Sequence, residues 1–467
     1  MTARIEHDLL GDETLPESAW YGIQTLRALR NFNITGVPIH HFSDLINTLT
    51  MVKEAAAEAN YELGLLDCKK IKAIRQACQR IRDGELHDQF VVDLIQGGAG
   101  TSTNMNANEV IANLALITMG HQKGEYQYLH PNNDINKSQS TNDAYPTAAR
   151  LAIVLSTQAL VHSLNSIQKS LDQKADEFAD ILKMGRTQLQ DAVPMTLGQE
   201  FKAFSVTLGE DIERIKEACT LLCEVNLGGT AIGTGLNTQR SYAAIAIEHL
   251  SRLSGLPVKS ATHLIEATSD MGAFVTISSI QKRLAIKLSK ICNDLRLLSS
   301  GPRAGLNEIN LPAMQPGSSI MPGKINPVIP EAVNQTAFQV IGHDLTVTMA
   351  AEAGQLQLNA MEPVIVYNIL NSMKMLSSAI YMLDHRCIRG ITANKAHCHN
   401  QVKDSIGMIT ALVPYIGYDN ASRIAKHALV SRSTVGEIIL KEKLLDEATL
   451  NHLMSPANMT GPMEAAL

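Results

Sequence analysis

The chain has 467 residues, more than one hydrophobic core usually organises, so two or three packed units are expected. Hydrophobic residues make up 45% and aromatic residues only 4%, so the core must consist mainly of Ala, Leu, Ile, Val and Met. Several of these residues favour helices. The net charge is −6, with neither sign gathered in long blocks, which argues against a nucleic-acid or membrane-surface partner.

The first residues contain no apolar region of the kind found in signal peptides, and no apolar run reaches the roughly 18 residues of a membrane helix. We therefore expect a cytoplasmic protein. Seven scattered cysteines favour reduced thiols over a disulfide framework. Two clusters resemble metal ligands, but neither has a second ligand pair at zinc spacing, so we interpret both as structural: Cys219 with Cys223, and His397-Cys398-His399.

The spacing of prolines predicts long helices in the middle of the chain, because proline is excluded from helix interiors. No proline lies between Pro146 and Pro194, and none lies from there to Pro257 or from Pro257 to Pro302. Apolar residues at steps of three and four predict one long helix over 274–298 and another helix around 212–222. Helices of this length favour a bundle that oligomerises. The predicted fold class is all-α.

Between the helical stretches lie segments rich in Gly, Ser, Thr and Asn, namely 97–108, 138–143, 185–194, 227–238 and 301–330. The last holds six of the 16 prolines, so we expect an extended connection, followed by a helical stretch between Pro330 and Pro363. None of these segments has the pattern of a phosphate-binding loop, so nucleotide binding is not supported.

The segment 317–327 (Gly-Ser-Ser-Ile-Met-Pro-Gly-Lys-Ile-Asn-Pro) offers two hydroxyls, a cation, an amide and backbone N–H groups near glycines. Together these groups can surround a carboxylate. Residues 138–143 and 185–188 add neutral donors, which are equally compatible with simple helix N-caps. The combination describes a site for a small polar anion that is recognised largely by neutral donors.

With these motifs in view, the sequence resembles the fumarase/aspartase superfamily, whose signature is similar to residues 317–327. The resemblance covers essentially the whole chain, from Asp8-Leu-Leu-Gly and Trp20-Tyr-Gly-Ile-Gln-Thr to Ile391-Thr-Ala-Asn and the last helical segment. It implies three domains, at 1–139, 140–394 and 395–467. The middle domain is then a long-helix bundle that forms the core of a homotetramer, with active sites shared between three subunits.

Four stretches look more like the aspartase branch than like fumarate hydratases: Gln96-Gly-Gly-Ala-Gly-Thr-Ser, Gly120-His-Gln-Lys-Gly-Glu-Tyr-Gln-Tyr, Asn136-Lys-Ser-Gln-Ser-Thr-Asn-Asp and Thr348-Met-Ala-Ala-Glu-Ala-Gly-Gln-Leu-Gln-Leu-Asn. This resemblance implies a carbon–nitrogen lyase that converts L-aspartate reversibly into fumarate and ammonia. No cofactor is required. Activation by Mg²⁺ occurs in some members, but no local cluster in the sequence locates such an ion.

The family's functional residues can be carried over to matching positions. Ser318 matches the serine that takes the proton from the substrate Cβ. Thr187, Lys324 and Asn326 match the groups that hold the α-carboxylate. The groups around the β-carboxylate are matched by Ser140, Thr141 and Ser319. The surroundings of the amino group are matched by Thr101, Asn142 and Gln188.

The chemistry makes specific demands on these residues. Proton removal beside a carboxylate produces an aci-carboxylate dianion, which the donors must bind more tightly than the ground state. A serine hydroxyl is too weakly acidic to serve as a base unless its oxyanion is stabilised. Backbone N–H groups between Ser319 and Lys324, and the charge of Lys324, are suitable donors. The structural alternative is that Ser318 only caps a turn.

Position 188 departs from the pattern, because many superfamily members have histidine where this chain has Gln188. Glutamine cannot transfer a proton at physiological pH. An ammonium group leaves with its proton already attached, whereas a hydroxyl must be protonated, so glutamine fits deamination better than hydration. Glu331 either supports Gln188 or is an ordinary first-turn carboxylate of the next helix, and we prefer the second interpretation.

Three alternatives stay open. A fumarate hydratase would use water in place of ammonia as the nucleophile towards fumarate. Lyases that act on argininosuccinate or adenylosuccinate share the signature. A non-catalytic protein similar to the lens crystallins of this superfamily is disfavoured, because the candidate pocket and loop residues are all retained.

Overall fold

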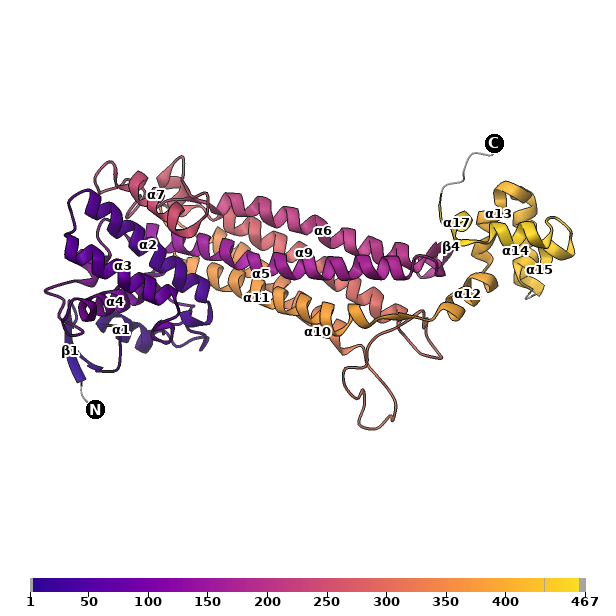
Figure 1. The fold of residues 1–467 in the computed structure, drawn as a ribbon, viewed down its shortest axis with the longest axis horizontal. Coiled ribbons are helices and arrows are strands. Elements are labelled where there is room, and N and C mark those ends of the chain that lie inside the picture. The colour runs from indigo at the N-terminus through magenta and orange to yellow at the C-terminus, as the bar shows by residue number, and fades with distance from the viewer. Residues whose placement is uncertain (1–2, 432, 462–467) are drawn as a thin grey trace. The chain divides into compact units, whose positions relative to one another are not determined.

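The computed structural model describes residues 3–431 and 433–461, and these residues are mostly helical, which confirms the predicted fold class. Five of the described helices are between 25 and 37 residues long. They are α5 (Thr141–Glu177), α6 (Leu197–Leu222), α9 (Gly272–Leu298), α10 (Val328–Glu352) and α11 (Glu362–Arg386). Figure 1 shows the helices in chain order by colour.

The long helix predicted over 274–298 is α9, and its apolar positions Phe274, Ile277 and Leu284 are fully buried. The helical stretch predicted between Pro330 and Pro363 is shorter in the structure, because α10 ends at Glu352 and α11 begins only at Glu362. Pro330 lies in the first turn of α10, where the missing N–H costs nothing. At the other end, the side chain of Asn359 donates to the carbonyls of Ala350 and Ala351 (3.0 and 3.1 Å), which stabilises the helix terminus.

The structure divides into two compact units. Unit 1 comprises residues 1–161, 213–283 and 338–376. Besides its parts of the long helices, it contains two small two-stranded sheets, shorter helices and a π-helical turn. These elements are β1 (Ala3–Asp8), β2 (Gly11–Pro16), α1 (Ile23–Asn31), α2 (Ser43–Glu62), α3 (Cys68–Arg82), α4 (Thr101–Thr118), the turn Pro131–Ile135, β5 (Glu224–Val225), α7 (Tyr242–Ser254), β6 (Lys259–Ser260) and α8 (Leu264–Ser269).

Unit 2 comprises residues 162–212, 284–337 and 377–467. It holds two further two-stranded sheets and a group of short helices near the C-terminus. These elements are β3 (Leu182–Thr187), β4 (Gln190–Thr196), β7 (Ile309–Asn310), β8 (Thr392–Ala393), α12 (Lys395–Asp404), α13 (Ile409–Ile416), α14 (Tyr418–Ser431), α15 (Val435–Lys441), α16 (Glu447–Leu453) and α17 (Pro456–Met459).

The domain boundaries predicted at 139/140 and 394/395 stay predictions. The ends of the first and third predicted domains, residues 1–2 and 462–467, lie outside the described residues. Side chains after 395 share one hydrophobic cluster, which includes Ile424 and Ile439 together with Met184 of β3. Among the described helices, none is long and apolar enough to cross a membrane.

Buried polar contacts join the long helices within each unit. In unit 1, the Ser278 hydroxyl of α9 donates to Asp344 of α10 at 2.8 Å. In unit 2, the Asn334 side chain of α10 donates to the carbonyl of Ser289 on α9 at 3.1 Å. Buried hydrogen bonds of this kind fix the register between helices, because an unpaired polar group inside the bundle would be costly. Within each unit, the helices are therefore a firm support for the loops that they carry.

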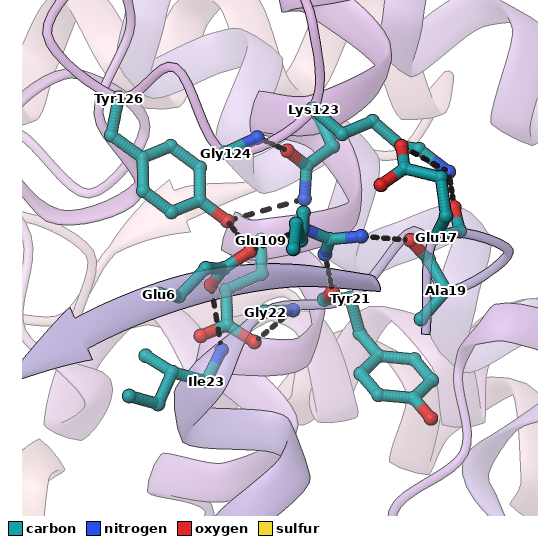
Figure 2. A network of polar contacts seen from close by, with 12 residues as sticks. Glu6, Glu17, Ala19, Tyr21, Gly22, Ile23, Glu109, Lys123, Gly124 and Tyr126 are labelled. Atoms are coloured by element: carbon teal, nitrogen blue, oxygen red, sulfur yellow. Dashed lines mark hydrogen bonds and ion pairs between the residues drawn. The ribbon is translucent and has the colours of Figure 1, made fainter. Parts of the chain in front are cut away.

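Unit 1 also contains a buried polar network that fastens its N-terminal segment (Figure 2). The carboxylate of Glu109, on α4, accepts from the backbone N–H groups of Gly22, Gln24 and Thr25 and from the Thr25 hydroxyl, at 2.6 to 3.1 Å. These groups lie at the start of α1, so Glu109 caps a helix distant in sequence. Burial and the nearby Glu6 carboxylate raise the pKa of Glu109 to about 7.

We predict that Glu109→Ala lowers the free energy of unfolding by about 3 kcal/mol or more, because the substitution leaves several buried donors without an acceptor. The unfolding midpoint in denaturant measures the change. Glu17→Ala, at a more exposed carboxylate of the same region, is the matched control and should shift the midpoint little. Equal midpoints for the two variants would contradict the capping role.

Candidate active site

The first candidate residue, Thr101, begins helix α4 directly after Gly100. Gly100 has φ of +88°, and a Cβ there would lie within about 2.8 Å of the ring of Tyr145 in α5. Glycine is therefore required both by the backbone conformation and by the close approach of Tyr145. This contact places the starts of α4 and α5 next to each other. Helix N-termini favour anions, because their first N–H groups have no partner within the helix.

The start of α5 carries the candidates Ser140, Thr141 and Asn142. The hydroxyl of Ser140 accepts from the N–H of Asn142 at 3.2 Å, so Ser140 acts as an N-cap as well as a candidate ligand. The side chain of Asn142 donates to the carbonyl of Ala231 at 2.7 Å. The N-cap interpretation of this segment is thus correct for Ser140, and it is compatible with a role towards substrate.

Asp143 supports this segment and was not singled out from the sequence, although it belongs to the polar segment 138–143. Its fully buried carboxylate accepts from the N–H groups of Ser140, Gly228 and Thr230 at 2.8 to 3.2 Å. Asp143 therefore holds the Gly-rich segment 227–238 against the start of α5. Burial raises the pKa of Asp143, and the three backbone donors and Lys53 oppose that shift.

Lys53 of α2 is a second residue that the sequence analysis missed. Its fully buried ammonium donates to the side-chain carbonyls of Asn104, Asn136 and Gln139 at 2.6, 2.9 and 2.8 Å. Asn104 lies one turn after Thr101, and Gln139 directly precedes Ser140. Lys53 therefore fixes the first turn of α4 against the segment that leads into α5. A single lysine among apolar residues gives no sequence signal for this role.

Burial lowers the pKa of Lys53 to about 7, whereas the ordinary value is 10.5, and the carboxylate of Asp143 opposes the shift. Between pH 7 and pH 10.5, Lys53 carries a proton in the unfolded chain but has lost it in the folded chain. The contribution of Lys53 to stability must therefore rise as the pH increases above 7, by at most about 1.4 kcal/mol per pH unit.

We accordingly predict that the difference in unfolding free energy between the wild type and Lys53→Met grows from pH 7 to pH 9. Denaturant titrations of both proteins at several pH values measure it. A difference that stays constant over this range would mean that Lys53 keeps its proton in the folded protein.

Thr187 and Gln188 lie at the tip of the β3–β4 hairpin, which the sequence analysis treated only as a polar segment. Thr187 pairs with Gln190, so the turn consists of Gln188 and Leu189, with φ of +56° and +61°. Two-residue turns with positive φ match the twist of hairpins, but they normally use Asn and Gly. A leucine in this conformation is strained, and such strain is found where surrounding structure holds a functional segment in place.

The third group of candidates lies on the loop between α9 and α10. The hydroxyl oxygen of Ser318 accepts from the N–H groups of Ile320 and Met321 at 3.2 and 3.1 Å. These are donors of the kind that a serine oxyanion needs, and the same contacts form the turn cap that is the structural alternative for Ser318. Ser318 is half-buried, whereas Ser319 and Lys324 are exposed.

The neck of this loop is closed by its own backbone. The N–H of Gly317 donates to the carbonyl of Lys324 at 2.9 Å, and the Asn326 side chain donates to the carbonyl of Gly317 at 2.6 Å. A Cβ at position 317 would overlap the Lys324 carbonyl oxygen. Asn326 therefore has a structural role in the loop besides its expected role towards the α-carboxylate. A cavity of about 550 Å³ lies beside the neck and is lined by Lys324, Asn326 and Glu331, among others.

Glu331 lies in the first turn of α10, as we had preferred, and its N–H donates to the carbonyl of Pro327 at 3.2 Å. The clusters that resembled metal ligands have structural partners: His397 contacts the carbonyl of Leu306 at 2.9 Å, and Cys398 is buried. None of the seven cysteines, all of which lie in the described residues, is paired in a disulfide. In the described part of the chain, no group of three His, Cys, Asp or Glu side chains is placed to hold a metal.

The candidates fall into two sets. Unit 1 carries Thr101, Ser140, Thr141 and Asn142, and the structure brings these together at two adjoining helix starts. Unit 2 carries Thr187, Gln188, Ser318, Ser319, Lys324 and Asn326, on the hairpin tip and on the loop.

Replacement of Gly317 by alanine should open the neck of the loop, because the added methyl group displaces the Lys324 carbonyl. We predict a loss of turnover of at least about 10²-fold, since small displacements of a reacting group are costly. The helical content should be unchanged, because the loop lies between helices. Activity on the expected substrate and circular dichroism of Gly317→Ala measure the two effects. Gly436→Ala in α15 is the control, because a Cβ there would meet only Leu450 at 3.6 Å, an ordinary contact. Full activity of Gly317→Ala would contradict the role of the closed neck.

Comparison with known proteins shows which family the chain belongs to. Residues 11–342 match the protein family described as "Lyase", and residues 408–461 match the family described as "Fumarase C C-terminus". The aspartate ammonia-lyase of Pseudomonas aeruginosa is 63% identical over 99% of this chain and 98% of its own length. The enzyme of the same name from Escherichia coli K12 is 55% identical over 98% of this chain and 96% of its own length. This chain belongs to the aspartate ammonia-lyase family.

Solved structures show the fold of the wider superfamily. A fumarate lyase:delta crystallin from Brucella melitensis, described as bound to cobalt, is 56% identical, with a TM-score of 0.96 over 99% of this chain and all of its own. A class II fumarase from Schistosoma mansoni is 34% identical, with a TM-score of 0.93 over 99% of this chain and all of its own. The all-α fumarase/aspartase-like fold predicted from the sequence is therefore confirmed.

Proposed function

We propose that the chain catalyses the reversible deamination of L-aspartate to fumarate and ammonia, with Ser318 as the general base. The observation that carries this proposal is the pair of backbone N–H groups that contact the Ser318 hydroxyl. A serine oxygen that receives such donors can carry negative charge and accept a proton from carbon. The likeness to aspartate ammonia-lyases over nearly the whole chain supports the choice of substrate.

In the proposed reaction, the Ser318 oxyanion takes the Cβ proton, and the electron pair moves into the β-carboxylate to form the aci-carboxylate dianion. That pair then forms the carbon–carbon double bond as the Cα–N bond breaks on the opposite face. The nitrogen leaves as neutral ammonia, because it keeps three hydrogens and the bonding electrons. The proton on Ser318 is passed to solvent. Gln188 at the hairpin tip can hold the amino group without transferring a proton.

The dianion needs donors, and unit 1 offers them at the starts of α4 and α5. Ser140 and Thr141 supply hydroxyls there, next to N–H groups at helix N-termini. The Thr101 hydroxyl donates to the carbonyl of Gly98 at 2.7 Å in this structure, so it must turn to donate to substrate. Such donors stabilise an anion most when they are already oriented. Lys53 and Asp143 orient these donors, because Lys53 bonds Asn104 of α4 and Asp143 accepts from the N–H of Ser140. Ser319 adds a hydroxyl from the loop, and Lys324 adds a positive charge for the α-carboxylate.

A homotetramer with shared active sites belongs to the same proposal. Phe338, Leu345 and Met349 of α10 are 63, 62 and 64% exposed in the single chain. Their spacing of seven and four residues places them on one helix face, and an apolar stripe of this kind is typical of a subunit interface. We also propose a cytoplasmic location and a reaction that requires no cofactor. Activation by Mg²⁺ is proposed without assigned residues.

The first test measures fumarate by its ultraviolet absorbance, from L-aspartate and separately from L-malate, with the purified protein. We expect production from L-aspartate alone. Production from L-malate instead would identify a fumarate hydratase. This is the second candidate function, because the chain is 34% identical to a fumarase of known structure. No production from either substrate would contradict the proposal and favour another lyase substrate or a structural role.

The role of Ser318 is tested separately. Ser318→Ala should reduce kcat by about 10³-fold or more, because the general base is removed while the fold is kept. Ser269→Ala is the matched control, since the Ser269 hydroxyl donates to the carbonyl of Glu266 within its own helix. Turnover of Ser318→Ala close to that of the control would show that another group takes the proton.

A further inference from the structure

Glu308 is a fully buried carboxylate in unit 2, on the segment that leads from α9 towards the loop with Ser318. Nothing in its sequence surroundings marks it as part of a site. Its surroundings in the structure do, because its two oxygens contact cations from strand β3. One oxygen accepts a hydrogen bond from the Arg186 guanidinium, and the other lies 2.8 Å from the Lys183 ammonium.

Hydrogen bonds to the end of α9 and to the residue that precedes α12 also hold the backbone of Glu308. Its N–H donates to the carbonyl of Leu298, at the end of α9, at 2.9 Å. Its carbonyl accepts from the N–H of Asn394 at 2.9 Å and lies 3.6 Å from the thiol of Cys398. The next two residues pair with β8 in a short sheet. Glu308 is therefore a rigid point to which β3 can be attached.

The hairpin needs such an attachment. Its two-stranded ladder is interrupted by a bulge between Met184 and Arg186, just before the tip. Beyond the bulge only Arg186 and Thr187 are paired, with Asp191 and Gln190, and the turn itself has two strained residues. A short ribbon of this kind is only marginally stable by itself. The ion pair between Arg186 and Glu308 holds the ribbon exactly one residue before Thr187, where the ladder gives the least support.

We propose that Glu308 is a positioning residue for the reaction: through Arg186 and Lys183 it orients the hairpin tip that presents Thr187 and Gln188 to substrate. This inference rests on the proposed function, because it gives the tip a role towards the α-carboxylate and the amino group. It adds a residue that acts through others and does not itself contact substrate.

The role predicts a particular kinetic signature. The α-carboxylate and amino group are held in the ground state as well as in the transition state, so a misplaced tip weakens both. KM should therefore rise more than kcat falls. A merely structural carboxylate would lower stability and leave KM unchanged.

The test compares Glu308→Gln with Asp384→Asn in the full-length protein. Asp384 is also fully buried in unit 2, and it accepts from Arg389 and Ser166 at 2.7 to 3.1 Å; neither partner belongs to the hairpin or is a candidate residue. Both variants remove one buried charge from an ion pair. We expect Glu308→Gln to raise KM for L-aspartate by about tenfold or more, with a smaller fall in kcat. Asp384→Asn should keep the wild-type KM despite a comparable fall in the unfolding midpoint.

A second variant keeps the test decisive if Glu308→Gln does not fold. Arg186→Lys retains the charge but loses the forked guanidinium, so KM should still rise several-fold. A wild-type KM in Arg186→Lys, or in folded Glu308→Gln, would overturn the role of Glu308 alone. Equal rises in KM for Glu308→Gln and Asp384→Asn would also overturn it. A wild-type protein without turnover on L-aspartate would instead overturn the proposed function, and the inference with it.

Discussion

The two backbone N–H groups that contact the Ser318 hydroxyl are the interaction on which the proposed chemistry depends. A serine can remove a proton from carbon only if its oxyanion is stabilised, and here the stabilising donors belong to the same short loop. Their geometry therefore depends on the closed neck between Gly317 and Lys324. The neck depends on the absence of a side chain at Gly317. The reactivity of one oxygen thus follows from backbone conformation.

The same principle applies to the other candidate segments, each of which is held by a buried charged group. Lys53 fixes the start of α4, Asp143 fixes the start of α5, and Glu308 contacts the strand before the hairpin tip. Burying a charge is costly unless it is fully paired, so each group accepts or donates several contacts. The long helices supply the rigid surroundings that make such pairing possible. Loops with neutral donors are in this way kept in fixed positions for substrate.

Much of this arrangement was accessible from the sequence. Proline spacing and the apolar stripe predicted α9 and the helical class, and the motif around Ser318 predicted donors near the serine. The hairpin around Gln188 was missed, because its turn lacks the Asn and Gly that normally mark one. The buried charges were missed for a different reason. A lone Lys53 or Glu308 acquires its role only through partners that are distant in sequence, and spacing within one segment cannot show such contacts.

The most direct test of the central claim is the fate of the two Cβ hydrogens of L-aspartate. Each can be replaced by deuterium in turn, and the fumarate formed can be followed by NMR. A single base on one face predicts that the deuterium at one Cβ position is lost completely and that the deuterium at the other position is retained in fumarate. Ser318→Ala should form almost no fumarate from either deuterated aspartate. Loss of both labels, or stereospecific loss at the wild-type rate in Ser318→Ala, would contradict the account.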